Sequence, residues 1–195
     1  PDFERFTAQA EELVAEETGL YSQMGEARGR VADRPMWIEA NIDSFQRLLR
    51  PLEGKLAQKE KSVLGELGMK ASGAEMGMLL GWMSGRVLGQ YDLLIVEDEN
   101  PEDQDMVYYV GPNVIALEKK YGFPPEEFRL WLALHECTHR AQFTGVPWLR
   151  DHFLGLVNKT LDTVDPDPEI LREAVKRIVE AKKSGEDPFA DGGIP

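Results

Sequence analysis

The chain has 195 residues, of which 42% are hydrophobic and 29% charged, a size and composition typical of one soluble globular domain. The formal net charge of −13 argues against a nucleic-acid groove or an anionic membrane surface as the main partner, because both reward clustered Lys and Arg. No apolar run approaches the roughly 20 residues of a transmembrane helix, and the single Cys137 cannot form an internal disulfide. We therefore expect a cytoplasmic protein that binds neither nucleic acid nor membrane.

Two helices are predicted near the N-terminus. An amphipathic pattern indicates a first helix over 3–18, which ends near Gly19. A second helix begins with Asp33 as its N-cap and Pro35 in its first turn, and continues until Pro51.

Five glycines recur every four residues in the next segment: Gly73, Gly77, Gly81, Gly85 and Gly89. Each glycine costs a helix on the order of 1 kcal/mol relative to alanine, and the spacing places them on one face. We expect this smooth face to allow close approach of another backbone in a soluble core. A membrane-type helix dimer is the alternative, which the charges of Glu75 and Arg86 disfavour.

The pattern then changes from helical to extended. The segments YDLLIV (91–96) and MVYYVGPNVIAL (106–117) are rich in β-branched and aromatic residues, and they flank a polar loop that contains Pro101. We predict a β-hairpin whose first strand, a continuous apolar run, is covered on both faces.

Three helices are predicted after the hairpin. The first begins at Pro124-Pro125-Glu126-Glu127, a favourable start signal, and ends at Gly145. The second opens at Pro147, and the third covers roughly 167–183. The residues that follow, 184–195, form a loose tail. The predicted fold is α+β and predominantly helical, in a single domain over 1–195.

The segment LHECTHRAQF carries the clearest chemical signal of the chain. His135 and His139 lie about 40° apart on one helical face, one turn apart along the axis. Both imidazoles could therefore bind one zinc ion, with bonds of roughly 2.0–2.1 Å. Glu136 lies about 100° around from His135, where it could act on a metal-bound water as general base without being a ligand. This is the chemistry of the H-E-x-x-H motif.

Three features make this short pattern more specific. It lies on a segment that is predicted to be helical, and all three histidines of the chain fall between 135 and 152. The segment is also apolar on nearly all sides, so we expect the histidines to lie inside the protein. The alternative interpretation is two core histidines satisfied by hydrogen bonds, with the glutamate paired to an arginine.

A catalytic zinc usually has three protein ligands and one open position. His152, 13 residues beyond His139, could return to the metal through a tight helix-turn-helix, or could be a surface histidine beside Asp151. Three carboxylates on the helix predicted over 167–183 are further candidates: Glu169, Glu173 and Glu180. Glu173 has apolar neighbours and could face inward. The sequence leaves this choice open.

Longer stretches resemble a known family. Four stretches resemble a bacterial zincin-like metallopeptidase family formerly described as a domain of unknown function. In chain order they are VADRPMWIEANIDSFQRLL, VLGQYDLLI, YYVGPNV and FRLWLALHECTHRAQFTGVPWLRDHF. Some members of the family are labelled coenzyme F420 biosynthesis-associated hydrolases. The resemblance covers roughly residues 31–157. Long strings in the right order are much more specific than H-E-x-x-H alone.

The resemblance implies a zincin-like fold with the motif helix in its core, His135 and His139 as zinc ligands, and Glu136 as the base. Members of this family run longer and carry a later Leu-Glu-Gly-His-like segment, whose glutamate would be the third ligand. This chain contains no such segment and begins without Met. We therefore expect a chain truncated at its C-terminus, or a protein that has lost this segment, and in either case an incomplete metal site.

Two polar residues in the matching stretches have both a functional and a structural interpretation. Asp92 could orient a zinc-bound histidine, and Asn113 could bind the backbone of a substrate. Asp and Asn are also common in turns at strand ends, and this second interpretation is favoured.

The sequence thus predicts a Zn²⁺-dependent hydrolase, a metallopeptidase that acts on a peptide or protein substrate, with Glu136 activating water. The alternative is a non-catalytic helical scaffold or binding protein that retains the motif as a relic. The substrate, endo- or exo-action and the oligomeric state stay open.

Overall fold

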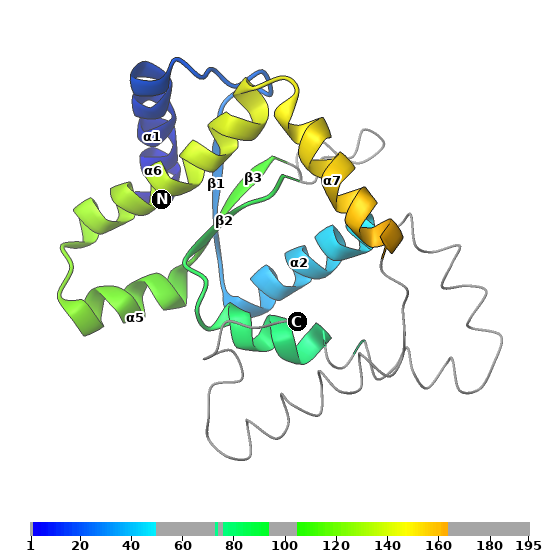
Figure 1. Ribbon diagram of the computed structural model, residues 1–195. Coiled ribbons are helices and arrows are strands. Elements are labelled where there is room, and N and C mark those ends of the chain that lie inside the picture. Colours follow the sequence, from blue (N-terminus) through cyan, green and yellow to red (C-terminus); the bar gives the residue numbers. More distant parts are fainter. Residues whose placement is uncertain (1, 50–72, 74–75, 94–104, 164–195) are drawn as a thin grey trace.

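The computed structural model describes residues 2–49, 73, 76–93 and 105–163, which form helices around a small sheet (Figure 1). In chain order the elements are α1 (Asp2–Thr18), β1 (Arg28–Ala32), α2 (Arg34–Leu49), β2 (Gly89–Tyr91), β3 (Met106–Val110), α5 (Gly111–Tyr121), α6 (Pro125–Gly145) and α7 (Leu149–Thr163). Residues 76–84 form a further helical segment. The mostly helical α+β class is confirmed. The helix predicted over 167–183 and the tail 184–195 lie outside the described residues.

The sheet has the order β1-β3-β2. Strand β3 is central: it pairs with β1 in parallel and with β2 in antiparallel, with Gln90 opposite Tyr108. All five residues of β3 are buried, because strands flank both of its edges and helices cover both of its faces. The predicted pairing of two strands in a hairpin is confirmed for β2 and β3.

The bounds of the hairpin strands differ from the prediction. Strand β2 begins at Gly89, two residues before the predicted segment 91–96, of which residues 94–96 lie outside the described residues. The second strand, predicted over 106–117, ends at Val110, and helix α5 follows it directly. Pro112 explains the change, since its fixed φ and missing N–H suit the first turn of a helix.

Strand β1 was not predicted. Its sequence RGRVA carries two arginines, and only Ala32 at its end is buried, so it lacks the alternation that indicates a strand. It forms because β3 offers a complete row of partners over Arg28–Ala32. Pairing with a strand nearly 80 positions away in the chain is not a local signal.

The first two helices follow their local signals. Gly19 has φ +70, and its N–H donates to the carbonyl of Ala15 at 2.9 Å, which ends α1 as predicted. Asp33 Oδ1 accepts the N–H of Met36 at 2.8 Å, so it caps α2 as predicted. None of the described helices combines enough length and apolarity to cross a bilayer.

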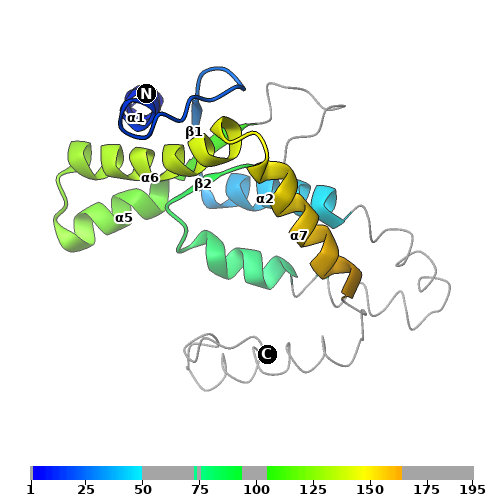
Figure 2. The ribbon, with the colours of Figure 1, turned by 45° about the horizontal axis from the view of Figure 1, so that its top comes forward.

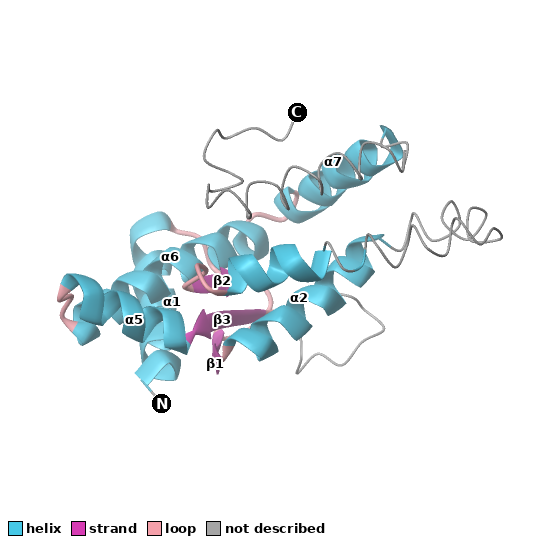
Figure 3. Cartoon of the chain, turned by 90° about the horizontal axis from the view of Figure 1, so that it is seen from below, coloured by secondary structure: helices cyan, strands magenta, loops and turns pink. Residues whose placement is uncertain are grey.

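The core has two parts, one on each face of the sheet. Val107 and Tyr109 of β3 pack with α1 and α6, while Met106, Tyr108 and Val110 pack on the other side with α2 and the helical segment 76–84. This division follows from the twofold alternation of side chains along a strand. Figures 2 and 3 show the sheet between these two groups of helices.

Among the described residues, no backbone approaches the helical part of the glycine stripe closely, in contrast to our prediction. Gly73, Gly77 and Gly81 are exposed, and a Cβ at any of them would meet no described atom within 4 Å. The helical segment instead turns apolar residues such as Leu80 toward the core. The last glycine of the series, Gly89, is not helical at all, since it begins β2.

Candidate functional site

Helix α6 carries the H-E-x-x-H motif and forms one wall of the core. Pro125 opens it, and Glu126 and Glu127 lie in its first turn near the positive end of the helix dipole. One face of α6 packs against α1 and the sheet. Its buried residues are Leu132, Ala133, Glu136, Cys137, Arg140, Ala141 and Thr144.

The two histidines of the motif lie together, as their spacing predicts. The ring centroids of His135 and His139 are 4.8 Å apart, with the rings nearly perpendicular. Trp131, one turn earlier, stacks on His135 at 5.9 Å. The expectation that the histidines lie inside is wrong, because both are exposed and Trp131 is 55% exposed. Apolar residues occur all around α6, but only the face that carries Glu136 meets the core.

Glu136 points to the sheet and is 6% exposed. The backbone N–H of Tyr91 in β2 donates to its carboxylate, which lowers the pKa of Glu136, but burial has the larger effect and raises that pKa to about 7. A carboxyl group with a pKa near neutrality can both accept and return a proton at neutral pH. Glu136 therefore has the electrostatic environment of a general base.

The carboxyl group of Glu136 lies directly on the backbone of β2. A Cβ built on Gly89 would be 2.7 Å from Oε1 of Glu136 and 2.8 Å from its Cγ. Sequence reasoning missed Gly89 and the N–H of Tyr91, because the run of glycines suggested a helix. The residues Gln-Tyr-Asp-Leu-Leu after Gly89 are the signal that could have assigned it to a strand.

The described side chains include two candidate zinc ligands that lie together, and no third joins them. The two adjacent imidazoles fit half of a tetrahedral zinc site in donor chemistry. Within the described ranges, however, no group of three or more His, Cys, Asp or Glu side chains is arranged to hold a metal ion. His152 is exposed on α7, with its ring 5.7 Å from that of Trp148, and does not join the pair. Glu173 lies outside the described residues.

A buried ion-pair network fixes α6 behind the motif. The guanidinium group of Arg140, which is 1% exposed, donates to Asp105 at 2.6 Å and to Glu11 on α1 at 2.6 Å. The hydroxyl of Tyr91 donates to the same Asp105 at 3.0 Å. The network thus joins α1, β2 and the residue before β3 to the helix that carries Glu136. Sequence reasoning missed it, since its members lie 35 to 129 positions from Arg140.

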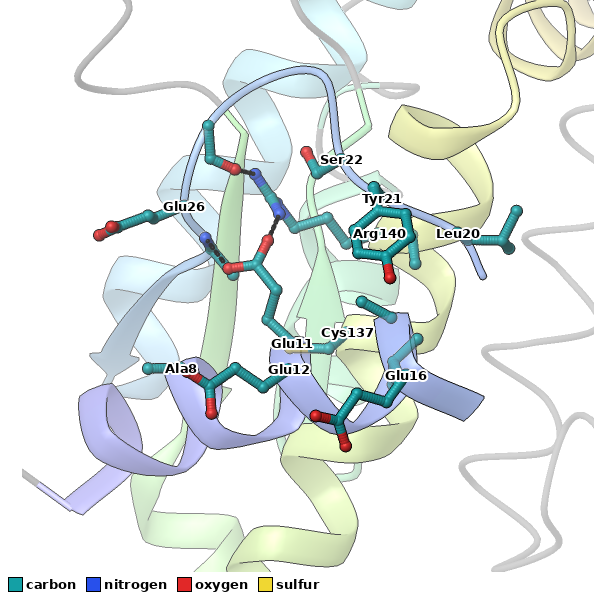
Figure 4. A pocket seen from close by; sticks show the side chains of 15 residues that line it. Ala8, Glu11, Glu12, Glu16, Leu20, Tyr21, Ser22, Glu26, Cys137 and Arg140 are labelled. Atoms are coloured by element: carbon teal, nitrogen blue, oxygen red, sulfur yellow. Dashed lines mark hydrogen bonds and ion pairs between the residues drawn. The ribbon is translucent and has the colours of Figure 1, made fainter. Parts of the chain in front are cut away.

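A cavity of about 820 Å³ lies on the buried side of α6, between α1 and the segment 20–27 (Figure 4). Cys137 and Arg140 line it from α6, and Glu11 in its wall accepts hydrogen bonds from Arg140 and from the N–H of Ala27. No histidine is among its lining residues. The cavity is therefore separate from the His135–His139 pair.

Asp92 and Asn113 both have structural partners. The Asn113 amide donates to the carbonyls of Ser84 and Val87 at 2.7 Å, and its oxygen accepts from Arg34. Both amide hydrogens are thus used inside the protein, which contradicts substrate binding by Asn113. Asp92 is buried and accepts a hydrogen bond from the hydroxyl of Ser44 on α2 at 3.3 Å.

Comparisons with known proteins identify the family of this chain. A family model described as zincin-like metallopeptidase matches residues 2–187. A crystal structure of a proposed hydrolase with a novel fold, from Chloroflexus aurantiacus, is 32% identical with a TM-score of 0.64. The match covers 91% of this chain and 55% of that one, so the chain spans about half the length of its relative. No curated protein matches. The family match covers nearly the whole chain, and we conclude that the chain belongs to the zincin-like metallopeptidase family.

Proposed function

We propose that this chain carries the zinc-binding half-site and the general base of a hydrolase that cleaves peptide or protein substrates. One observation carries the proposal: α6 holds the imidazoles of His135 and His139 4.8 Å apart, and the residue directly after His135 is a buried glutamate with a pKa raised to about 7. The family and the Chloroflexus aurantiacus relative support hydrolysis as the reaction class.

His135 and His139 would hold zinc through neutral imidazole nitrogens. Zinc at this position would lower the pKa of a bound water and polarise the carbonyl of the substrate. Glu136 takes the proton of the attacking water on a carboxylate oxygen and returns it to the leaving amine. The N–H of Tyr91 holds that carboxylate against β2, and burial keeps the basicity of Glu136 suited to neutral pH.

The proposal requires a third ligand from outside the described residues, because no described side chain joins the two histidines in a three-ligand group. Glu173 and a glutamate beyond Pro195 are the candidates. Either carboxylate would complete a set of two histidines and one acid, which leaves the fourth position of the zinc for water.

The test is the substitution Glu136→Gln, which keeps the shape of the side chain but removes its basicity. We expect the variant to bind as much zinc as the wild type and to lose hydrolysis of a fluorescent casein by at least about a hundredfold. Glu127→Gln, on the exposed first turn of the same helix, is the matched control and should retain full activity. Full activity in Glu136→Gln would overturn the mechanism.

The same lack of a third described ligand favours one alternative, a non-catalytic binding protein that retains the motif. In that case purified protein would hold little zinc, and His139→Ala would change no function. Zinc content and the hydrolysis assay together distinguish the two proposals.

A further inference from the structure

We propose that Gly89 is a positioning residue for Glu136: the absence of a side chain at position 89 lets the carboxyl group lie directly on strand β2. A Cβ there would be 2.7 Å from Oε1 of Glu136, 2.8 Å from Cγ and 3.0 Å from Cδ. Three atoms of one side chain would thus be displaced together. The catalytic meaning of this contact rests on the proposed function, but the contact itself does not.

Space, and not backbone conformation, is the reason for glycine at this position. The described glycines with positive φ are Gly19, Gly25 and Gly122, and Gly89 is not among them. An alanine could therefore adopt the backbone conformation of residue 89 without strain. The three heavy atoms nearest to that Cβ all belong to Glu136, so the cost of a side chain there comes first from this contact.

Strand β2 cannot easily move away from Glu136. Its residue Gln90 accepts a hydrogen bond from Trp37 Nε1 at 2.8 Å and donates one to Asn41 Oδ1 at 3.0 Å, both on α2. The N–H of Tyr91 is at the same time the donor that holds the carboxylate. A side chain at position 89 would therefore displace the carboxyl group of Glu136 and not the strand.

The histidines lie outside this contact. His135 and His139 are on the exposed face of α6, whereas the atoms nearest to a Cβ at Gly89 belong to the buried Glu136. A substitution at Gly89 should therefore disturb the base and leave the two metal ligands in place.

A double-mutant cycle tests the contact without any assay of activity. Urea unfolding with EDTA present would be measured for the wild type, Gly89→Ala, Glu136→Ala and the double variant. We expect Gly89→Ala to lower the folding equilibrium constant about tenfold or more in the wild-type background, and less than about threefold when Glu136 is already alanine. An equal loss in both backgrounds would overturn the proposal.

Gly81→Ala is the matched control, since no described atom lies within 4 Å of its Cβ position. It should change the folding constant by the same factor with and without Glu136.

Cobalt(II) alone, added to the same proteins, tests whether Gly89 positions Glu136 relative to the proposed metal site. We expect equal cobalt binding by all variants, with the visible absorption of Gly89→Ala shifted toward that of Glu136→Ala. A wild-type spectrum for Gly89→Ala, beside a changed spectrum for Glu136→Ala, would contradict a positioning role. If no variant binds cobalt, the proposed metal site fails for this chain, while the unfolding cycle still decides whether Gly89 positions Glu136.

Discussion

The two faces of helix α6 have different surroundings: one is buried against the core and the other is exposed to solvent. The buried face carries Glu136, Cys137 and Arg140, each of which is in contact with the core or paired within it. The exposed face carries His135 and His139, whose rings touch each other. The motif of five residues therefore buries the proposed base and exposes the two proposed metal ligands to solvent. Consecutive residues of a helix lie about 100° apart around its axis. Neighbours in the sequence, such as His135 and Glu136, can therefore have opposite environments.

The largest expected effect comes from the buried face. Arg140→Ala would leave the carboxylates of Asp105 and Glu11 without their main counter-charge, and one of them, Asp105, is itself buried. We expect a loss of about 3–5 kcal/mol in the free energy of unfolding, measured by urea denaturation. Arg5→Ala removes an exposed ion pair with Glu126 and should cost less than about 1 kcal/mol. Similar losses of stability in Arg140→Ala and Arg5→Ala would contradict the claim that the buried ion pairs stabilise the protein more than the exposed one.

Glu136 should make the stability of the metal-free protein depend on pH. Folding raises its pKa from 4.5 to about 7, so the native state binds the proton more tightly than the unfolded state does. The contribution of the protonated group to stability is complete below pH 4.5 and is lost as the pH rises through 7.

The glutamine side chain in Glu136→Gln cannot ionise, so this variant should not lose that stability as the pH rises. In EDTA we expect its free energy of unfolding, relative to wild type, to be about 2–3 kcal/mol more favourable at pH 8 than at pH 5. Glu127→Gln, at an exposed position, should show no such change. A constant difference between Glu136→Gln and wild type across this range would mean that Glu136 is not desolvated.

Cys137 offers a chemical probe of the same face. Burial raises the pKa of its thiol to about 12, and the thiolate is the form that reacts with disulfide reagents. We expect Cys137 to react with such a reagent at pH 8 at least about a hundredfold more slowly in the native protein than in urea. Equal rates would show that this face of α6 is open to solvent.

The smallest expected change in stability comes from substitutions on the exposed face of α6. In the metal-free protein, His135→Ala and His139→Ala should each change the free energy of unfolding by less than about 1 kcal/mol, because the side chains are exposed. The same variants should lose zinc binding, which equilibrium dialysis would measure. A large loss of stability without metal would instead favour two structural histidines.

Local signals predicted much of the helical framework. Asp33 as a cap, Gly19 as a stop and the prolines before α6 act within a few residues, so they are visible in the sequence. The error after Val110 came from apolar residues that suit a strand and a buried helix equally. Strand β1 escaped prediction because only its pairing with β3 makes it a strand.

The part of the candidate site that lies within α6 was predictable, because it too depends on local geometry. The contact between His135 and His139 follows from helical geometry alone, as does the different direction of Glu136. Which face of α6 meets the core depends on α1 and the sheet, so the exposure of the histidines was not predictable. The contact of Glu136 with Gly89 joins residues 47 positions apart, and no periodic pattern encodes it.

The most direct test of the account is the zinc content of the purified chain, prepared without chelator or metal-affinity tag, beside His139→Ala and Glu136→Gln. We predict zinc in the wild type and in Glu136→Gln, and none in His139→Ala, because we propose His139 as a ligand and Glu136 as the base. Equal zinc in all three proteins would contradict the assignment of His139, and loss of zinc in Glu136→Gln alone would make Glu136 a ligand.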